Sequence, residues 1–312
     1  MFDRGRWRLS PELDDVILGR LVKSLDVPGK WALARGDSFY ASRLSGLFEQ
    51  SGSNWDRRQH RFSTLAGSLA HTAIPARWLS REPKNPDALI LYACSGYVRM
   101  REYGAVAEPS SLIELCRTAA ELNPPDPTPW ALMIGISCLA HLPQREIFTA
   151  WNEAVSRDRW NRQAHLQMLD HLSPDNGGSY VRVTEFVDAV RCAVPADSPC
   201  IGIEMIAHVN HYRRALDRGG VAAVTAPSYW SQHTVSAALD RALNHWPKPG
   251  FLTHSAALAD LNTLAYALSA ARRAADAATV FEAIGSVVTP WPWSLDGDPL
   301  DEFKRRQRAT HR

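Results

Sequence analysis

Apolar residues recur at helical spacing along nearly all of the 312-residue chain. Residues 127–160 show this pattern clearly, with four small or apolar side chains on one helix face at i, i+3, i+4 and i+7: Ala131, Ile134, Gly135 and Cys138. Two segments rich in β-branched residues, 179–183 and 201–203, are short and stand between helical patterns. The pattern therefore predicts an all-α fold.

Three helices are expected before residue 85. Ser10 is followed by Pro11 and Glu12, which gives the hydroxyl cap, first-position proline and first-turn acid typical of a helix start. A second helix is expected to begin at Asp37, and residues 55–70 form a third amphipathic stretch.

From residue 85 onward, polar and proline-containing breaks separate the helical stretches at regular intervals. The breaks begin at residues 85, 123 and 157, so they fall 38 and then 34 residues apart. Proline suits such breaks because it cannot continue a preceding helix but fits the first turn of the next one. This spacing is typical of repeated helix hairpins.

The order of large and small residues in these hairpins resembles the tetratricopeptide repeat (TPR). Residues 127–160 and 258–291 carry the resemblance best, and 86–124 carry it with an insertion. Three positions depart from the TPR pattern: Cys138, Ile147 and Leu268. The whole chain also resembles uncharacterised TPR-like proteins of actinobacteria. This resemblance implies antiparallel helix hairpins stacked in a right-handed superhelix, and it implies no particular activity.

The breaks suggest three regions, and a continuous superhelix without a sharp boundary fits the pattern equally well. Residues 1–84 are expected to form an N-terminal helical region, 85–194 the TPR-like repeats, and 195–312 further helical repeats with a capping segment. Trp291 and Trp293 are the residues expected to shield the end of the array from water.

Composition excludes some classes of protein and suggests a location, but it does not identify an activity. Lys and Arg number 35 against 33 Asp and Glu, a net charge of +2, so no strong overall field favours nucleic acid. The chain has no apolar run of roughly 18 residues, as a membrane span would need, and its charged start does not fit a signal peptide. Five widely spaced cysteines without a CxxC motif favour reduced, buried thiols and a cytoplasmic location.

Basic residues gather in three short clusters. Their members are Arg4, Arg6 and Arg8; Arg57, Arg58 and Arg61; and Lys304, Arg305, Arg306 and Arg308. We expect these side chains to lie on the solvated surface. A regulator that touches nucleic acid through them is the alternative, and no recognised nucleic-acid-binding motif accompanies them.

One constellation could carry metal chemistry. Glu204, His208 and His211 are spaced at i, i+4 and i+7, which places them on one helix face, and their side chains can ligate metals. The simpler interpretation is that both histidines flank a core stripe of the same helix. The possible metal site leads to the alternative hypothesis, a helical enzyme of specialised metabolism with a pocket inside the array. No nucleophile motif such as GxSxG is present to support a different kind of catalysis.

The leading hypothesis is a protein-interaction module without catalysis of its own. It needs no catalytic residue, cofactor or metal, and its partner is a protein or peptide held in a concave groove. Asn262 and Tyr266 are expected to face outward and orient the partner, because an amide and a phenol both suit peptide recognition. Trp130, at the start of a helix, is expected to be partly exposed and to contribute to the same surface.

Overall fold

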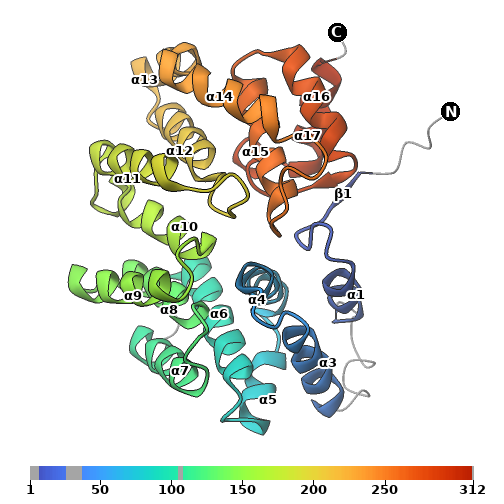
Figure 1. The fold of residues 1–312 in the computed structure, drawn as a ribbon, viewed down its shortest axis with the longest axis vertical. Coiled ribbons are helices and arrows are strands. Elements are labelled where there is room, and N and C mark those ends of the chain that lie inside the picture. The colour runs from blue at the N-terminus through green and yellow to red at the C-terminus, as the bar shows by residue number, and fades with distance from the viewer. Residues whose placement is uncertain (1–6, 26–36, 105–107, 311–312) are drawn as a thin grey trace, which may run out of the picture. The chain divides into compact units, whose positions relative to one another are not determined.

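The computed structural model describes residues 7–25, 37–104 and 108–310. Within these ranges the chain forms sixteen α-helices, three short 3-10 helices and one pair of two-residue strands (Figure 1). The predicted all-α class is confirmed. None of the helices in the described ranges combines the length and the apolar character that a membrane span requires.

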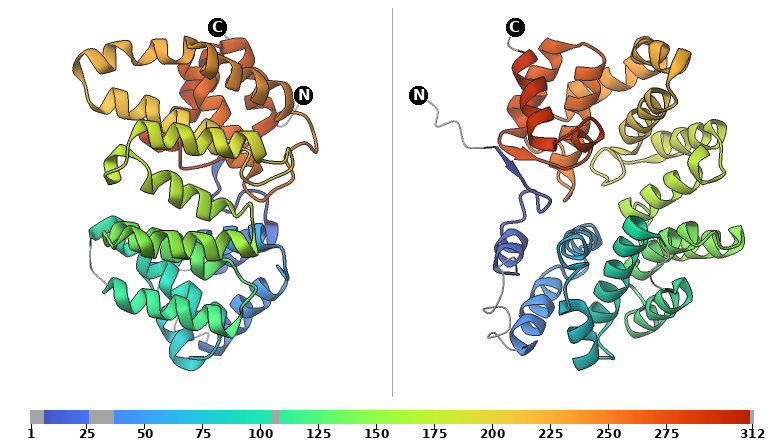
Figure 2. Two further views of the ribbon diagram at one scale, coloured as in Figure 1. Left: turned by 60° about the vertical axis from the view of Figure 1, so that its left-hand side comes forward. Right: turned by 180° about the vertical axis from the view of Figure 1, so that it is seen from behind.

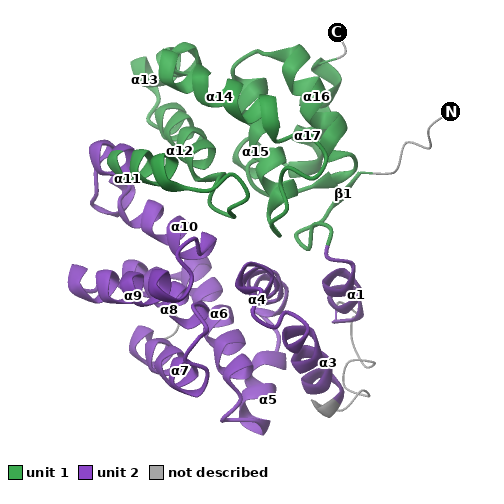
Figure 3. Ribbon diagram, in the orientation of Figure 1, with its two compact units in different colours: residues 1–14, 185–312 green, residues 15–184 purple. Residues whose placement is uncertain are grey.

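The chain divides into two compact units (Figure 3). Unit 1 comprises residues 1–14 and 185–312, and unit 2 comprises residues 15–184. The division falls within one helix, α11 (Tyr180–Ala193). The three regions expected from the sequence breaks stay a prediction.

Unit 2 is built from successive helices. Its elements before α11 are α1 (Val16–Leu25), α3 (Asp37–Glu49), α4 (Trp55–Leu69), α5 (Ile74–Arg81), α6 (Pro86–Tyr103), α7 (Pro109–Leu122), α8 (Thr128–Leu139), α9 (Gln144–Arg157), α10 (Arg162–His171) and the 3-10 helix η1 (Pro174–Asn176). Helix α6 packs on α7 and α8 packs on α9, and Figure 2 shows these helices running alongside one another. The hairpins predicted over 86–124 and 127–160 are therefore confirmed.

Side-chain capping explains where the hairpin of α6 and α7 begins. The side chain of Asn85 accepts hydrogen bonds from the backbone N–H groups of Asp87 and Ala88, and Pro86 occupies the first helical position of α6. Cys94, Cys116, Cys138 and Cys200 are buried, as predicted for most of the cysteines, whereas Cys192 is exposed. Burial raises the pKa of the Cys94 thiol to about 12, so this sulfur stays protonated and behaves as an apolar group.

Unit 1 is built around one buried helix. Its elements after α11 are α12 (Ile203–Asp217), α13 (Gly220–Thr225), the 3-10 helix η2 (Ala226–Ser231), α14 (His233–His245), α15 (Ala257–Ala270), α16 (Ala274–Ile284), β2 (Val287–Val288), the 3-10 helix η3 (Trp293–Leu295) and α17 (Pro299–Ala309). Helix α15 packs against α12, α14 and α16. The pairing of α15 with α16 confirms the hairpin predicted over 258–291.

The start of the described chain differs from the expectation. Ser10 does not cap a helix: its backbone N–H donates to the carbonyl of Val288, at 2.9 Å. The strand β1 (Arg8–Leu9) runs parallel to β2. The first helix begins only at Val16, after Asp15, whose carboxylate accepts from the N–H of Leu18 at 3.0 Å. Pairing with a distant strand has taken the place of the local cap.

The segment after α16 folds back onto the core of unit 1. Trp293 is fully buried, stacks near Phe281 and meets Phe303 of α17 edge-on, with ring centres 6.0 and 5.3 Å apart. A buried tryptophan ring contributes a large apolar area, which fits the capping role predicted for it. This packing also covers the side of α15 that carries Asn262 and Tyr266.

Candidate functional site: a pocket bounded by three helices

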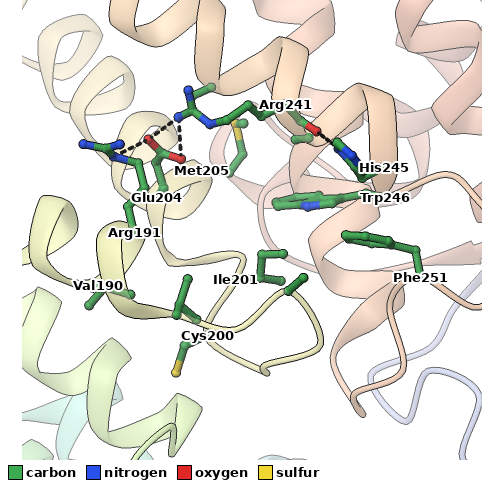
Figure 4. A pocket seen from close by; sticks show the side chains of 14 residues that line it. Val190, Arg191, Cys200, Ile201, Glu204, Met205, Arg241, His245, Trp246 and Phe251 are labelled. Atoms are coloured by element: carbon green, nitrogen blue, oxygen red, sulfur yellow. Dashed lines mark hydrogen bonds and ion pairs between the residues drawn. The ribbon is translucent and has the colours of Figure 1, made fainter.

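A cavity of about 450 Å³ lies within unit 1 between α11, α12 and α14 (Figure 4). Its lining comes from Val190, Arg191, Val194, Ala196, Cys200, Ile201, Glu204, Met205, Ala238, Arg241, Ala242, His245, Trp246 and Phe251. Most of these side chains are apolar. The cavity falls within the size range of ligand pockets, roughly 300–1,000 Å³.

Helical periodicity brings the wall residues together. On α14, Ala238, Arg241, Ala242 and His245 follow at i, i+3, i+4 and i+7, so all four share one face. The small alanine side chains leave space beside this face of the helix, while the arginine extends a charged group across it. The helix therefore supplies both an open apolar floor and a polar rim.

The loop that precedes α12 is held in place by a close backbone contact. A Cβ atom at Gly202 would lie 2.2 Å from a carboxylate oxygen of Asp260, so only glycine fits there. Asp260 is fully buried, and its carboxylate lies 3.4 Å from Nε2 of His254. This packing fixes Cys200 and Ile201, which precede the glycine, at the edge of the pocket.

A cluster of charged groups forms one end of the pocket. Nη2 of Arg241 donates to both carboxylate oxygens of Glu204, at 2.8 and 3.0 Å, and Nε of Arg191 lies 3.6 Å from the same carboxylate. The side chains of Arg241 and Arg191 are 50% and 41% exposed, against 22% for Glu204. Leaving His245 aside, two arginines and one glutamate give the pocket lining a net charge of +1.

Aromatic rings form the other end, as Figure 4 shows. Trp246 is 6% exposed, and Phe251 is half-buried beside His245, with ring centres 5.3 Å apart. Nδ1 of His245 lies 2.9 Å from the carbonyl oxygen of Arg241, one helical turn earlier. The pocket thus offers a charged end and an apolar, aromatic end to a single occupant.

The metal alternative at Glu204, His208 and His211 is wrong. The three residues do share α12, but Glu204 binds arginines, while His208 and His211 both contact Tyr229. The Tyr229 hydroxyl lies 2.6 Å from Nδ1 of His208, and its ring stacks on His211 at 4.4 Å. Across the described residues, no three His, Cys, Asp or Glu side chains are grouped to hold a metal ion.

The environment keeps both members of the tyrosine–histidine pair neutral. Burial, together with the nearby His211 and Arg241, lowers the pKa of His208 to about 4. Burial also raises the pKa of Tyr229 far above its usual value. Both groups are therefore neutral, and the hydrogen bond between the Tyr229 hydroxyl and Nδ1 of His208 makes the pair a structural contact between α12 and η2.

The outward orientation expected for Asn262 and Tyr266 is wrong, because both side chains are fully buried. Oδ1 of Asn262 accepts from the indole N–H of Trp293 at 2.8 Å, and its amide nitrogen donates to the carbonyls of Leu258 and Val287. The ring of Tyr266 lies against Trp293, with ring centres 5.5 Å apart. The segment after α16 therefore covers the face of α15 that was expected to meet a partner.

Trp130 is half-buried in the first turn of α8, in unit 2. The guanidinium of Arg157 lies 5.2 Å from the centre of its ring and donates to the carbonyl of Pro124. The partial exposure expected for Trp130 is confirmed, and its role in partner binding stays a prediction.

The basic clusters do not all reach solvent. Arg58 and Arg61 are buried, at 5% and 2% exposure, which contradicts the expected solvated surface. Arg61 pairs with Asp15 at 2.8 Å and donates to the carbonyl of Leu47. Arg4 and Arg6 lie outside the described residues, and Arg308 is exposed as expected.

Sequence reasoning singled out Glu204 but missed its partners. Arg241 lies 37 residues away, on another helix, so no local spacing connects the two. The available signal was the face of α14, where small residues alternate with Arg241 and His245 at helical spacing. No motif or spacing in the sequence distinguishes Trp246 and Phe251.

Comparisons with known proteins leave the family open: no family model, no curated protein and no solved structure matches this chain.

Proposed function

We propose that the chain is a TPR-like helical-repeat protein that binds a partner protein without catalysing a reaction. The helix hairpins α6–α7, α8–α9 and α15–α16 support the repeat architecture. The binding site is the pocket of unit 1, and the occupant is a short peptide segment of the partner. The buried face of α15 has no part in this proposal.

The single observation that carries the proposal is the apolar wall of the cavity beside half-exposed charged groups. Val194, Ile201 and Phe251 are only partly buried, although they line a cavity of about 450 Å³. Covering such a surface with an apolar side chain removes it from water, at about 25 cal/mol per Å² of apolar area. The arginines at the rim supply directional hydrogen bonds that favour a correctly placed partner.

A peptide array tests the proposal directly. Randomised peptides are probed with the full chain and with the variant Ala196→Trp, which places a large ring in the pocket from an exposed lining position. The matched control is Val224→Trp, which adds the same ring at a site 81% exposed and outside the pocket. Circular dichroism checks that both variants fold.

We expect the full chain and Val224→Trp to select the same peptides, and Ala196→Trp to lose at least tenfold in signal for them. Selection that is unchanged in Ala196→Trp would reject the pocket as the binding site. Selection of no peptide at all would reject the proposed function itself.

A further inference from the structure

The two ends of the pocket differ in chemistry, and this difference specifies an occupant. We infer that the partner segment carries an acidic side chain two positions away from a bulky apolar side chain and binds in an extended conformation. This inference rests on the proposed function and adds the chemical class of the bound segment.

The charged end has donor capacity that Glu204 does not use. Arg241 binds both oxygens of Glu204 through a single nitrogen, Nη2, and a guanidinium carries five N–H donors in total. Arg191 directs Nη2 to Asp188 at 2.8 Å and Nε to Glu204. With two arginines and one carboxylate in the lining, a second carboxylate completes the charge balance of this end.

Asp188 does not remove this preference for an acid. Its side chain is 56% exposed and does not line the pocket, so it pairs with Arg191 from outside. An exposed pair of this kind contributes little and is screened by salt. Arg241 has no such second acid among the described residues that line the pocket.

The length of the pocket sets the spacing between the acidic and the apolar side chain of the bound segment. Ala238 and His245 mark its extent along α14, and seven residues at 1.5 Å each span about 10 Å. The guanidinium of Arg241 and the rings of Trp246 and Phe251 lie toward opposite ends (Figure 4). In an extended peptide, residues i and i+2 point to the same side and lie about 7 Å apart, which leaves each side chain a short reach to its end.

Three blocked peptides of one length test the inference by calorimetric titration at low ionic strength. The first has the sequence Ser-Glu-Ala-Phe-Ser with acetylated and amidated ends, and the others replace Glu by Gln or by Lys. We expect the Glu peptide to bind about threefold more tightly than the Gln peptide, because an ion pair with a half-exposed arginine contributes modestly, though more than a neutral hydrogen bond. The Lys peptide should bind most weakly, and added salt should narrow the difference between Glu and Gln.

The variant Arg241→Gln assigns the preference to the pocket. It should bring the ratio of the Glu and Gln affinities to about one, while Arg117→Gln should leave that ratio unchanged. Arg117 is a matched control because it is also 50% exposed and pairs with a glutamate, Glu114, at 3.6 Å in unit 2. Unfolding curves of both variants confirm that the fold is retained.

Equal affinity for the Glu and Gln peptides, failure of the Glu peptide to bind, or tighter binding of the Lys peptide overturns the inference. Tighter binding of the Lys peptide would make Glu204 the recognising group instead. If the array still selects peptides that Ala196→Trp loses, the proposed function stands while this inference falls. If the array selects none, both fall.

Discussion

Two clusters of this molecule combine arginine and carboxylate side chains in opposite ratios. In unit 2, the single guanidinium of Arg58 binds the carboxylates of both Asp87 and Asp126, with side-chain exposures of 6%, 14% and 0%. In unit 1, Arg191 and Arg241 share Glu204, and both arginines are half-exposed. The comparison separates a cluster whose donors are enclosed by the fold from one whose donors remain accessible.

The enclosed cluster connects three helices of unit 2. Arg58 lies on α4, Asp87 in the first turn of α6, and Asp126 just before α8, where it accepts from the N–H of Thr128 at 2.8 Å. Burial alone would lower the pKa of Arg58, but Asp126 and Asp87 raise it above the usual value. Burial raises the pKa of Asp87 despite the opposing effect of Arg58. These groups connect three helices, and their side chains are mostly enclosed by the fold.

The largest effect is expected for Arg58→Met, which keeps the apolar stem and removes the charge. It leaves two buried carboxylates without their cation, a change that costs about 3–5 kcal/mol of unfolding free energy. Urea unfolding followed by circular dichroism measures the loss. Arg117→Met, at an exposed pair, serves as the control and should change stability by less than about 0.5 kcal/mol. A loss as small as that in Arg58→Met would contradict the structural role of the cluster.

The second effect concerns acid stability in unit 1. His208 has a pKa of about 4 in the fold against an ordinary 6.5, so the unfolded chain binds the extra proton first. The contribution of unprotonated His208 to the unfolding free energy is complete above pH 6.5 and is lost as the pH falls to about 4. This lowering of the pKa corresponds to roughly 3 kcal/mol of unfolding free energy.

The variant His208→Gln cannot titrate and should flatten the fall in stability between pH 6.5 and 4. Unfolding free energies across that range measure the slope. His233→Gln, at an exposed histidine of α14, should leave it unchanged. An unaltered slope in His208→Gln would show that this histidine is protonated normally in the fold.

A smaller loss is expected for Asn262→Ala, about 2 kcal/mol. The change leaves the indole N–H of Trp293 and two backbone carbonyls without the partner that Asn262 provides, and unpaired buried polar groups cost about 1–3 kcal/mol. Thermal unfolding monitors the loss. A shift within experimental error, together with loss of peptide binding, would instead return Asn262 to the role of a recognition residue.

The smallest effect on stability is expected for Arg241→Gln, below about 0.5 kcal/mol, because half-exposed ion pairs contribute little. Urea unfolding in parallel with Arg58→Met makes the comparison direct. If the two variants lost similar stability, the cluster in the pocket would be structural as well, and the distinction between the units would disappear.

The sequence was sufficient for the all-α class and for the three predicted hairpins, because both follow from periodicity and from breaks within a few dozen residues. It also placed Glu204, His208 and His211 on one helix correctly. Prediction from the sequence failed for residues that contact a segment distant in the chain. Trp293 covers Asn262 from 31 positions away, and Arg241 reaches Glu204 from another helix. A helical face looks the same in sequence whether solvent or a returning segment lies against it.

A surface groove of unit 2 serves as the internal alternative in the most direct test. It lies in unit 2 between α5, α6 and α7, has a volume of about 470 Å³, and includes Leu79, Tyr92 and Leu115. Hydrogen exchange measured with and without a peptide selected on the array reports which surface the peptide covers. A peptide bound in the pocket of unit 1 should slow exchange in α11, α12 and α14 and leave exchange in α5, α6 and α7 unchanged. Slower exchange confined to α5, α6 and α7, or none anywhere, would contradict the assignment of binding to the pocket of unit 1.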